Sequence, residues 1–240
     1  MSAARLARLS GQLTAAFVLV GALLAAGTAW AYPALGAAVC PGCYGLQRIA
    51  PGLAVERRMT APSRRALLVD LGIARERVTN TLGRFTERHL LVVCATAACH
   101  RRLGGGGARA MSLTTPFGSV IRVSPRGANT TILAHELAHV RIHGVAGWWA
   151  QITGTLPAWF DEGLAVIVSG DERYLRPDGT ARACADASGP PLPASPFDWA
   201  PRAGREPDLY AHAACAVSRW LETHGGAPAA LEMLRSGTIG

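Results

Sequence analysis

The sequence predicts an α+β fold, with a small mixed sheet that includes an edge strand and a mainly helical C-terminal part. Two observations lead to this prediction. Short apolar runs that suit strands lie between residues 89 and 124, and stretches with helical spacing of apolar residues follow from residue 129 onward. No charge run or Ser/Gly linker interrupts residues 32–240, so we expect them to form one domain.

Residues 1–31 differ from the rest of the chain. Arg5 and Arg8 precede residues 13–31, which carry no charge and end on Ala-Trp-Ala. This order is typical of a secretory signal peptide, while the length of the uncharged stretch leaves open an uncleaved membrane anchor. In both cases the remainder is exported, either to the periplasm or to the periplasmic face of the cytoplasmic membrane, with possible membrane association through residues 13–31.

Export changes the interpretation of the six cysteines, because disulfides form in oxidising compartments. We expect the pairs Cys40–Cys43, Cys94–Cys99 and Cys184–Cys215. A redox-active Cys-Pro-Gly-Cys motif is the alternative. It would have to lie between a strand and a helix, whereas here the motif directly follows the export segment.

The elements of the first half are expected in the following order. Residues 32–62 form an irregular initial segment marked by Pro and Gly. A helix begins at Ser63, because apolar residues recur at spacings of three and four as far as Leu82. The apolar run at residues 89–95 forms a buried strand, and the four glycines at 104–107 form a loop.

Two further strands are expected at residues 111–115 and 119–124, separated by a Pro-Phe-Gly turn. In the second strand polar and apolar residues alternate, which favours a half-exposed edge strand packed on the next helix. Residues 170–208 are expected to be rich in loops. Helices are expected from about 129 to 143, 159 to 169, 209 to 222 and 228 to 235.

The formal charge of +8 first suggests a nucleic-acid partner. All 24 basic residues are Arg, however, and they are dispersed along the chain in nothing longer than short pairs. No nucleic-acid-binding motif accompanies them, and export would separate the chain from nucleic acid. We therefore expect no nucleic-acid partner.

The strongest functional signal is His-Glu-Leu-Ala-His at residues 135–139, which matches the HExxH pattern. On a helix, His135 and His139 lie one turn apart on the same face, so both imidazoles can reach one metal ion. Glu136 lies beside them and can accept a proton from metal-bound water. The alternative without a metal ion is a pair of partly buried histidines that contact other polar groups.

A catalytic zinc ion usually requires a third protein ligand. The metzincin pattern would place Gly and His at positions that hold Ile142 and Val145. His143 lies two turns beyond His135, about 12 Å along the helix axis, which is too far for both to bind one ion. We expect His143 either to support another residue of the site or to face solvent.

The sequence Trp-Phe-Asp-Glu-Gly-Leu-Ala at 159–165, after HExxH, resembles the gluzincin metallopeptidases, the thermolysin and aminopeptidase N type. The resemblance covers about residues 130–235. It implies a Zn²⁺ site with Glu162 as the third ligand. Asp161 would support a histidine or the helix start, and Gly163 would permit close helix packing.

The resemblance also implies a Tyr or His that donates a hydrogen bond to the developing oxyanion. Tyr210 is the candidate, with His212 as a lesser one. The implied function is an exported zinc metallopeptidase that hydrolyses a peptide or protein substrate, which the strand at 119–124 would align. The alternative is an exported or membrane-tethered binding or assembly factor with a structural zinc site, for which Glu136 would not be needed.

Overall fold

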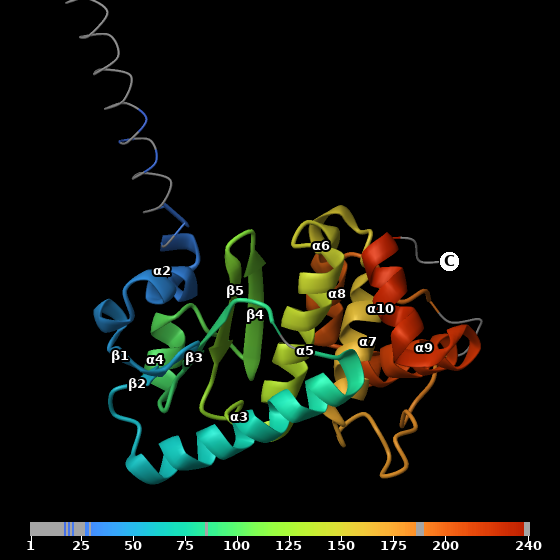
Figure 1. The fold of residues 1–240 in the computed structure, drawn as a ribbon, viewed down its shortest axis with the longest axis horizontal. Coiled ribbons are helices and arrows are strands. Elements are labelled where there is room, and N and C mark those ends of the chain that lie inside the picture. Colours follow the sequence, from blue (N-terminus) through green and yellow to red (C-terminus); the bar gives the residue numbers. More distant parts are fainter. Residues whose placement is uncertain are drawn as a thin grey trace, which may run out of the picture.

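The computed structural model describes residues 30–84, 86–185 and 190–237, together with residues 17, 19, 21, 27 and 28. The expected export segment lies almost entirely outside the described residues. Among the helices that are described, none is both long and apolar enough to cross a membrane. The described chain forms one five-stranded mixed sheet with helices around it, which confirms the α+β prediction (Figure 1).

The strands are β1 (Leu46–Ala50), β2 (Leu53–Glu56), β3 (His89–Val93), β4 (Ala110–Thr115) and β5 (Gly118–Val123). The helices of the first half are α2 (Pro33–Val39), the 3-10 helix η1 (Pro41–Tyr44), α3 (Ala61–Leu82) and α4 (Ala97–Arg102). Those of the second half are α5 (Thr130–Ala146), α6 (Ala150–Thr153), α7 (Ala158–Ser169), α8 (Pro196–Ala203), α9 (Leu209–His224) and α10 (Gly226–Ser236).

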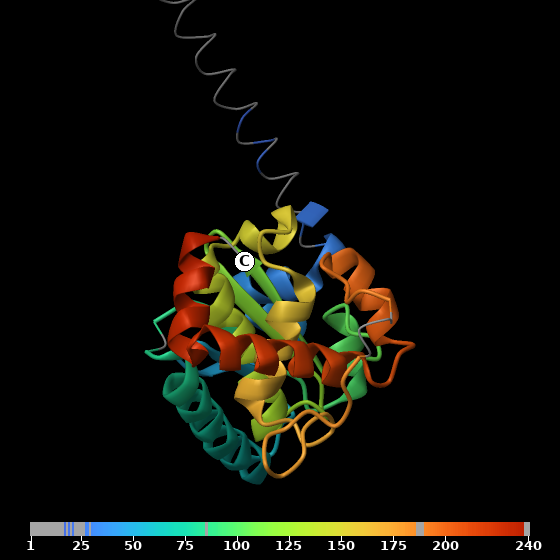
Figure 2. The same cartoon turned by 90° about the vertical axis from the view of Figure 1, so that its right-hand side faces the viewer.

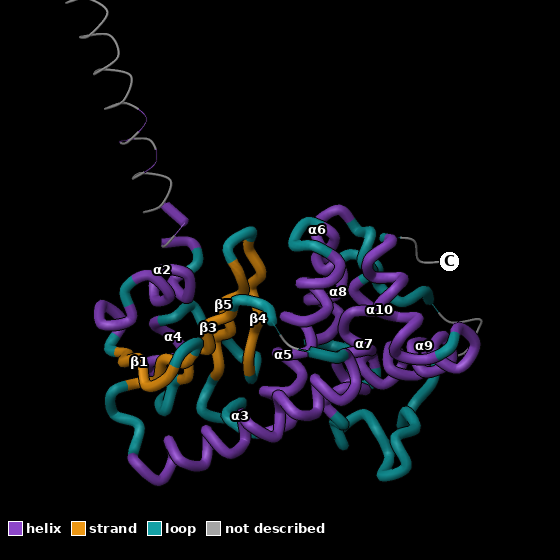
Figure 3. Tube along the Cα trace, in the orientation of Figure 1, coloured by secondary structure: helices purple, strands orange, loops and turns teal. Residues whose placement is uncertain are grey.

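The sheet has the strand order β1-β2-β3-β5-β4. Strands β2, β3 and β5 are parallel, while β1 and β4 pair antiparallel to their neighbours at the two edges. Helices α2 and α4 cover one face of the sheet, and α3 and α5 cover the other (Figures 1 and 2). The strands lie together in the N-terminal half and helices fill the C-terminal half, as the sequence predicts (Figure 3).

The prediction that residues 119–124 form the edge of the sheet was wrong. Strand β5 lies between β3 and β4, and β4 is the edge strand that packs against α5. The polar residues that suggested exposure are buried, and Arg122 donates from Nη1 to the carbonyl of Leu103 at 3.1 Å. Alternation along β5 therefore reflects two differently covered faces rather than one exposed face.

The initial segment was also predicted wrongly as irregular. It contains α2, η1 and the strands β1 and β2. Strand β2 has four residues, all buried, and pairs with β1 on one side and β3 on the other. A strand this short and covered on both faces shows no alternation, so its sequence signal is weak. Helix α8, in the stretch expected to be loop-rich, was missed as well.

Helices α3 and α5 begin where a side chain caps them. The Thr60 hydroxyl accepts a hydrogen bond from the Ser63 amide at 3.3 Å, and the Asn129 side chain accepts one from Ile132 at 3.1 Å. Helix α5 does not end at Gly144 as expected. A Cβ there would overlap with the side chain of Glu87, so this glycine permits close packing inside the helix.

The three expected disulfides are all present, as Cys40–Cys43, Cys94–Cys99 and Cys184–Cys215. The first lies between α2 and β1, so its Cys-Pro-Gly-Cys motif does not connect a strand to a helix as a redox motif would. The third joins the segment after α7 to α9 across 31 residues.

Candidate metal centre

Helix α5 carries the HExxH residues through the core, and most of its middle is buried. The one-turn spacing brings the Nε2 atoms of His135 and His139 to 3.1 Å from each other, with the two rings 4.7 Å apart and nearly perpendicular. Both nitrogens thus converge on one point beside the helix.

Helix α7, which packs against α5, supplies Glu162 at the same point. Its Oε2 lies 3.2 Å from Nε2 of His135 and 3.5 Å from Nε2 of His139. Ligand atoms held tetrahedrally about 2.0–2.1 Å from one small cation are about 3.3 Å apart. The three side chains, hereafter the metal triad, therefore have both the donors and the spacing that such an ion requires.

Asp161 precedes Glu162 on α7 and forms hydrogen bonds that orient His139 and His143. Its Oδ1 accepts a hydrogen bond from Nδ1 of His139 at 2.8 Å, and its Oδ2 accepts one from Nε2 of His143 at 2.8 Å. The first bond leaves Nε2 of His139 available as a ligand, which is the usual arrangement around bound metal. Asp161 thus supports histidines rather than the helix start.

His143 does not face solvent. It is 3% exposed, and its Nδ1 lies 2.9 Å from the hydroxyl of Thr114 on the edge strand β4. It is a supporting residue that holds Asp161. His135 has no equivalent support, because its Nδ1 is buried with no hydrogen-bond partner among the residues that the structure describes.

The charges around the metal triad shift several pKa values. Burial lowers the pKa of His139, but the carboxylates of Asp161 and Glu162 outweigh it and raise that pKa well above its usual value. Burial raises the pKa of Glu136 above that of an ordinary carboxyl group, although both triad histidines oppose the shift. A carboxylate with a raised pKa is a better proton acceptor near neutral pH.

A cavity of about 560 Å³ opens over the metal triad. Glu136 lines it together with the triad, and Ala110, Met111 and Ser112 of the edge strand β4 form one wall. A ligand in this cavity would therefore touch the triad, Glu136 and the unpaired edge of the sheet.

Tyr210, at the start of α9, lines the same cavity, with its ring 6.2 Å from that of His135. The negative charge of Glu162, and then burial, raise the pKa of Tyr210. Its phenol therefore stays protonated and able to donate. His212, the lesser candidate, does not line the cavity.

Sequence reasoning missed the aromatic wall that holds Tyr210. Tyr174 stacks on Tyr210 at 4.9 Å, and Trp199 of α8 meets its edge at 5.2 Å. Both come from the stretch expected to be loops. The Trp between Pro196 and Pro201 was the available signal, because Trp is on average a highly buried residue type.

Gly163 sets the distance between α7 and α9. A Cβ at this position would lie 2.5 Å from the carbonyl oxygen of Ala213 and 2.8 Å from Val217. The helix that carries Tyr210 therefore lies directly against the helix that carries Glu162, as the expected close packing requires.

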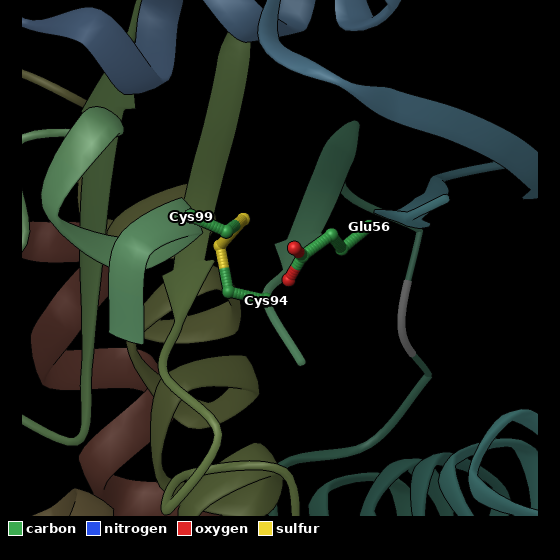
Figure 4. Close-up of side chains that lie close together, drawn as sticks. All are labelled: Glu56, Cys94 and Cys99. Atoms are coloured by element: carbon green, nitrogen blue, oxygen red, sulfur yellow. A yellow bond between two sulfur atoms is a disulfide. The ribbon is translucent and has the colours of Figure 1, made fainter. Parts of the chain in front are cut away.

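A second set of metal-type donors lies at the far side of the sheet, formed by Glu56, Cys94 and Cys99 (Figure 4). We refer to it as the disulfide group. Its sulfur atoms are bonded to each other. The Glu56 carboxylate accepts hydrogen bonds from the Ala95 and Thr96 amides at 2.9 and 2.8 Å. The donors are therefore already used, and this group serves to close the end of β3.

Comparison with known protein families, with curated proteins and with solved structures finds no match for this chain. Interpretation of the site thus depends on its own geometry, which presents three residues able to hold a metal ion in a cavity lined by a carboxylate and a phenol.

Proposed function

We propose that this protein is an exported zinc-dependent metallopeptidase of the gluzincin type. One observation supports it above the others. The nitrogens of His135 and His139 and the Glu162 oxygen lie 3.1–3.5 Å apart in a cavity that Glu136 also lines. Two histidines and a carboxylate are a known catalytic zinc set, and a structural zinc site would have no use for Glu136.

When bound, zinc would supply Lewis acidity to a water molecule and to the carbonyl of the scissile bond. Glu136 takes a proton from the water and passes it to the leaving amine. The Tyr210 phenol donates a hydrogen bond to the developing oxyanion, a contribution of up to about 3–4 kcal/mol for a well-placed donor. Asp161 keeps the His139 ring in the orientation that presents Nε2.

The edge strand β4 favours an extended polypeptide as the substrate. Three of its residues line the cavity, and its outer edge is not paired with another described strand. A peptide can add to such an edge through backbone hydrogen bonds, which align it without demanding one particular sequence. This role falls to β4 rather than to residues 119–124.

The substitution Glu136→Gln tests the proposal, because it keeps the size of the side chain but removes the base. We expect unchanged zinc content and about a 100- to 10,000-fold loss of peptide cleavage. Zinc analysis and digestion of a peptide library with both proteins are the measurements. Full activity in the variant would exclude the role of Glu136. Zinc in both proteins with cleavage by neither would favour the assembly factor with a structural zinc site.

A further inference from the structure

Several large apolar side chains are exposed although the described chain has a well-formed core. Phe117 is 88% exposed, Val39 87% and Trp149 53%. We refer to the following set as the apolar rim: Trp30, Tyr32, Val39, Phe117, Trp148, Trp149 and Ile152. Six of the seven follow residue 31, so they remain with the domain even if an export signal is removed there.

The apolar rim comes from three segments that are far apart in the sequence. They are the region of α2, the turn between β4 and β5, and the segment that contains α6. All three lie at the same end of the molecule, and they stay at this end when the view is turned about the vertical axis (Figures 1 and 2). A flat surface could thus touch all three segments together.

The three segments that form the rim carry no acidic residue. No Asp or Glu occurs in residues 30–50, 110–127 or 147–156, which supply the three segments. A groove of about 890 Å³ runs between α2 and the β4–β5 turn, and the exposed Arg48 and Arg88 line it. The surface is therefore apolar and aromatic with basic groups, which matches an interface with anionic headgroups.

We propose that the apolar rim docks the domain onto the surface of a lipid bilayer that contains anionic lipid. The uncharged residues 13–31 directly precede α2, which carries part of the rim, so a membrane that holds them would lie next to the rim. Trp and Tyr favour the headgroup region because one part of each ring is apolar and the other is polar. Docking does not depend on the metal triad.

Docking also has a consequence for the metal cavity, and this part rests on the proposed function. Gln151 of α6 lines the cavity, and α6 lies directly after two tryptophans of the rim. A bilayer at the rim would therefore lie beside the mouth of the cavity. Polypeptide segments close to a membrane surface would then be the favoured substrates.

Helix α3 offers an internal control. It exposes Leu68, Val69 and Ile73, which are aliphatic, and it lies at the opposite end of the molecule from α6 and the β4–β5 turn (Figure 1). If exposed apolar area alone caused lipid contact, α3 would contact lipid as well. If a tether at residues 13–31 only held the domain near the membrane, neither end would be preferred.

Photo-cross-linking of the full chain in vesicles of phosphatidylcholine and phosphatidylglycerol tests the proposal. The variants are Phe117→p-benzoylphenylalanine, Trp149→p-benzoylphenylalanine and, as the control, Val69→p-benzoylphenylalanine. We expect lipid adducts at the first two positions and none at the third. Equal labelling at all three, or no lipid adduct at the rim, would overturn the proposal, as would protein adducts in place of lipid adducts at the rim in whole membranes.

A second measurement keeps the test independent of the unnatural side chain. Quenching of tryptophan fluorescence by brominated lipid should fall when Trp148→Ser and Trp149→Ser are combined. It should also fall when phosphatidylglycerol is omitted from the vesicles. Trp30 of the rim remains in this variant, so the comparison is with the wild type: quenching that is unchanged by both changes would show that Trp148 and Trp149 do not contact lipid and would overturn the proposal. Neither measurement requires metal or activity, so the proposed peptidase function can fail without affecting the result.

Discussion

The metal triad and the disulfide group differ in one respect that decides their roles. Both bring three metal-type donors within 4.8 Å of one another. In the disulfide group a covalent bond and backbone amides already occupy the donors, whereas the triad nitrogens and carboxylate face a cavity. Proximity of donor residues is thus insufficient to make a metal site. The donors must also lack other partners and be accessible.

The largest expected effect of this difference is on zinc-dependent stability. A ligand that binds only the folded state stabilises it by about 4 kcal/mol at a concentration one thousand times its Kd. Urea unfolding with and without zinc should show that zinc raises the free energy of unfolding of the wild type. The Glu162→Gln variant should show no such increase. The matched control is Glu56→Gln in the disulfide group, which should keep the gain. Loss of the gain in Glu56→Gln would contradict the comparison.

The next effect concerns the covalent bond of the disulfide group. Replacement of both cysteines, as Cys94→Ala with Cys99→Ala, removes a short loop closure and should lower the free energy of unfolding by about 2 kcal/mol. Thermal or urea unfolding measures the change, and zinc titration of the folded protein should be unaltered. A weakened zinc affinity would show that the two groups are coupled.

The support of the metal triad can be weakened without removal of a ligand. Asp161→Asn keeps the shape of the side chain but removes the charge that holds His139 and His143. We expect zinc affinity to fall about 10- to 100-fold, as is usual when such a partner of a metal-binding histidine is lost. Competition with a zinc chelator gives the value. Unchanged affinity would mean that Asp161 serves only the fold.

The smallest expected effect is on the carboxylate of the disulfide group. Glu56→Gln replaces charge-assisted hydrogen bonds to the Ala95 and Thr96 amides with neutral ones. The free energy of unfolding should fall by about 1 kcal/mol. Denaturant unfolding of this variant measures it. A fall as large as that from the loss of the disulfide would indicate that the carboxylate, and not the covalent bond, closes the end of β3.

The sequence was most informative where local spacing alone decides the outcome. The residue pattern by itself places the two histidines of α5 one turn apart on a helix and the Asp-Glu-Gly stretch of α7 on the next one. The Cys40–Cys43 and Cys94–Cys99 disulfides were predicted because the two cysteines of each pair are close in the sequence, and Cys184–Cys215 is the pair that remained. Apart from the Cys184–Cys215 pair, which spans 31 residues, each of these predictions needs only the geometry of a short segment.

The parts that the sequence did not predict depend on contacts between distant segments. Arg122 looked like an outward residue of an edge strand, but its partner Leu103 comes from another part of the chain. The burial of His143 depends on Thr114 of β4 and Asp161 of α7. Strand β2 pairs with β3 on one side and with β1 on the other, and nothing within the few residues of β1 and β2 shows these pairings.

The hydrogen bond between Thr114 and His143 connects the residues that support the metal triad to the edge strand. If a neutral His143 donates to Asp161 through Nε2, its Nδ1 must accept the hydroxyl proton of Thr114, whose oxygen can then accept one from Ser119 at 2.9 Å. Three hydrogen bonds thus lead from the edge strand to His139. A peptide that pairs with β4 and disturbs Thr114 would therefore change the basicity of His139 through these hydrogen bonds, without contact with its imidazole.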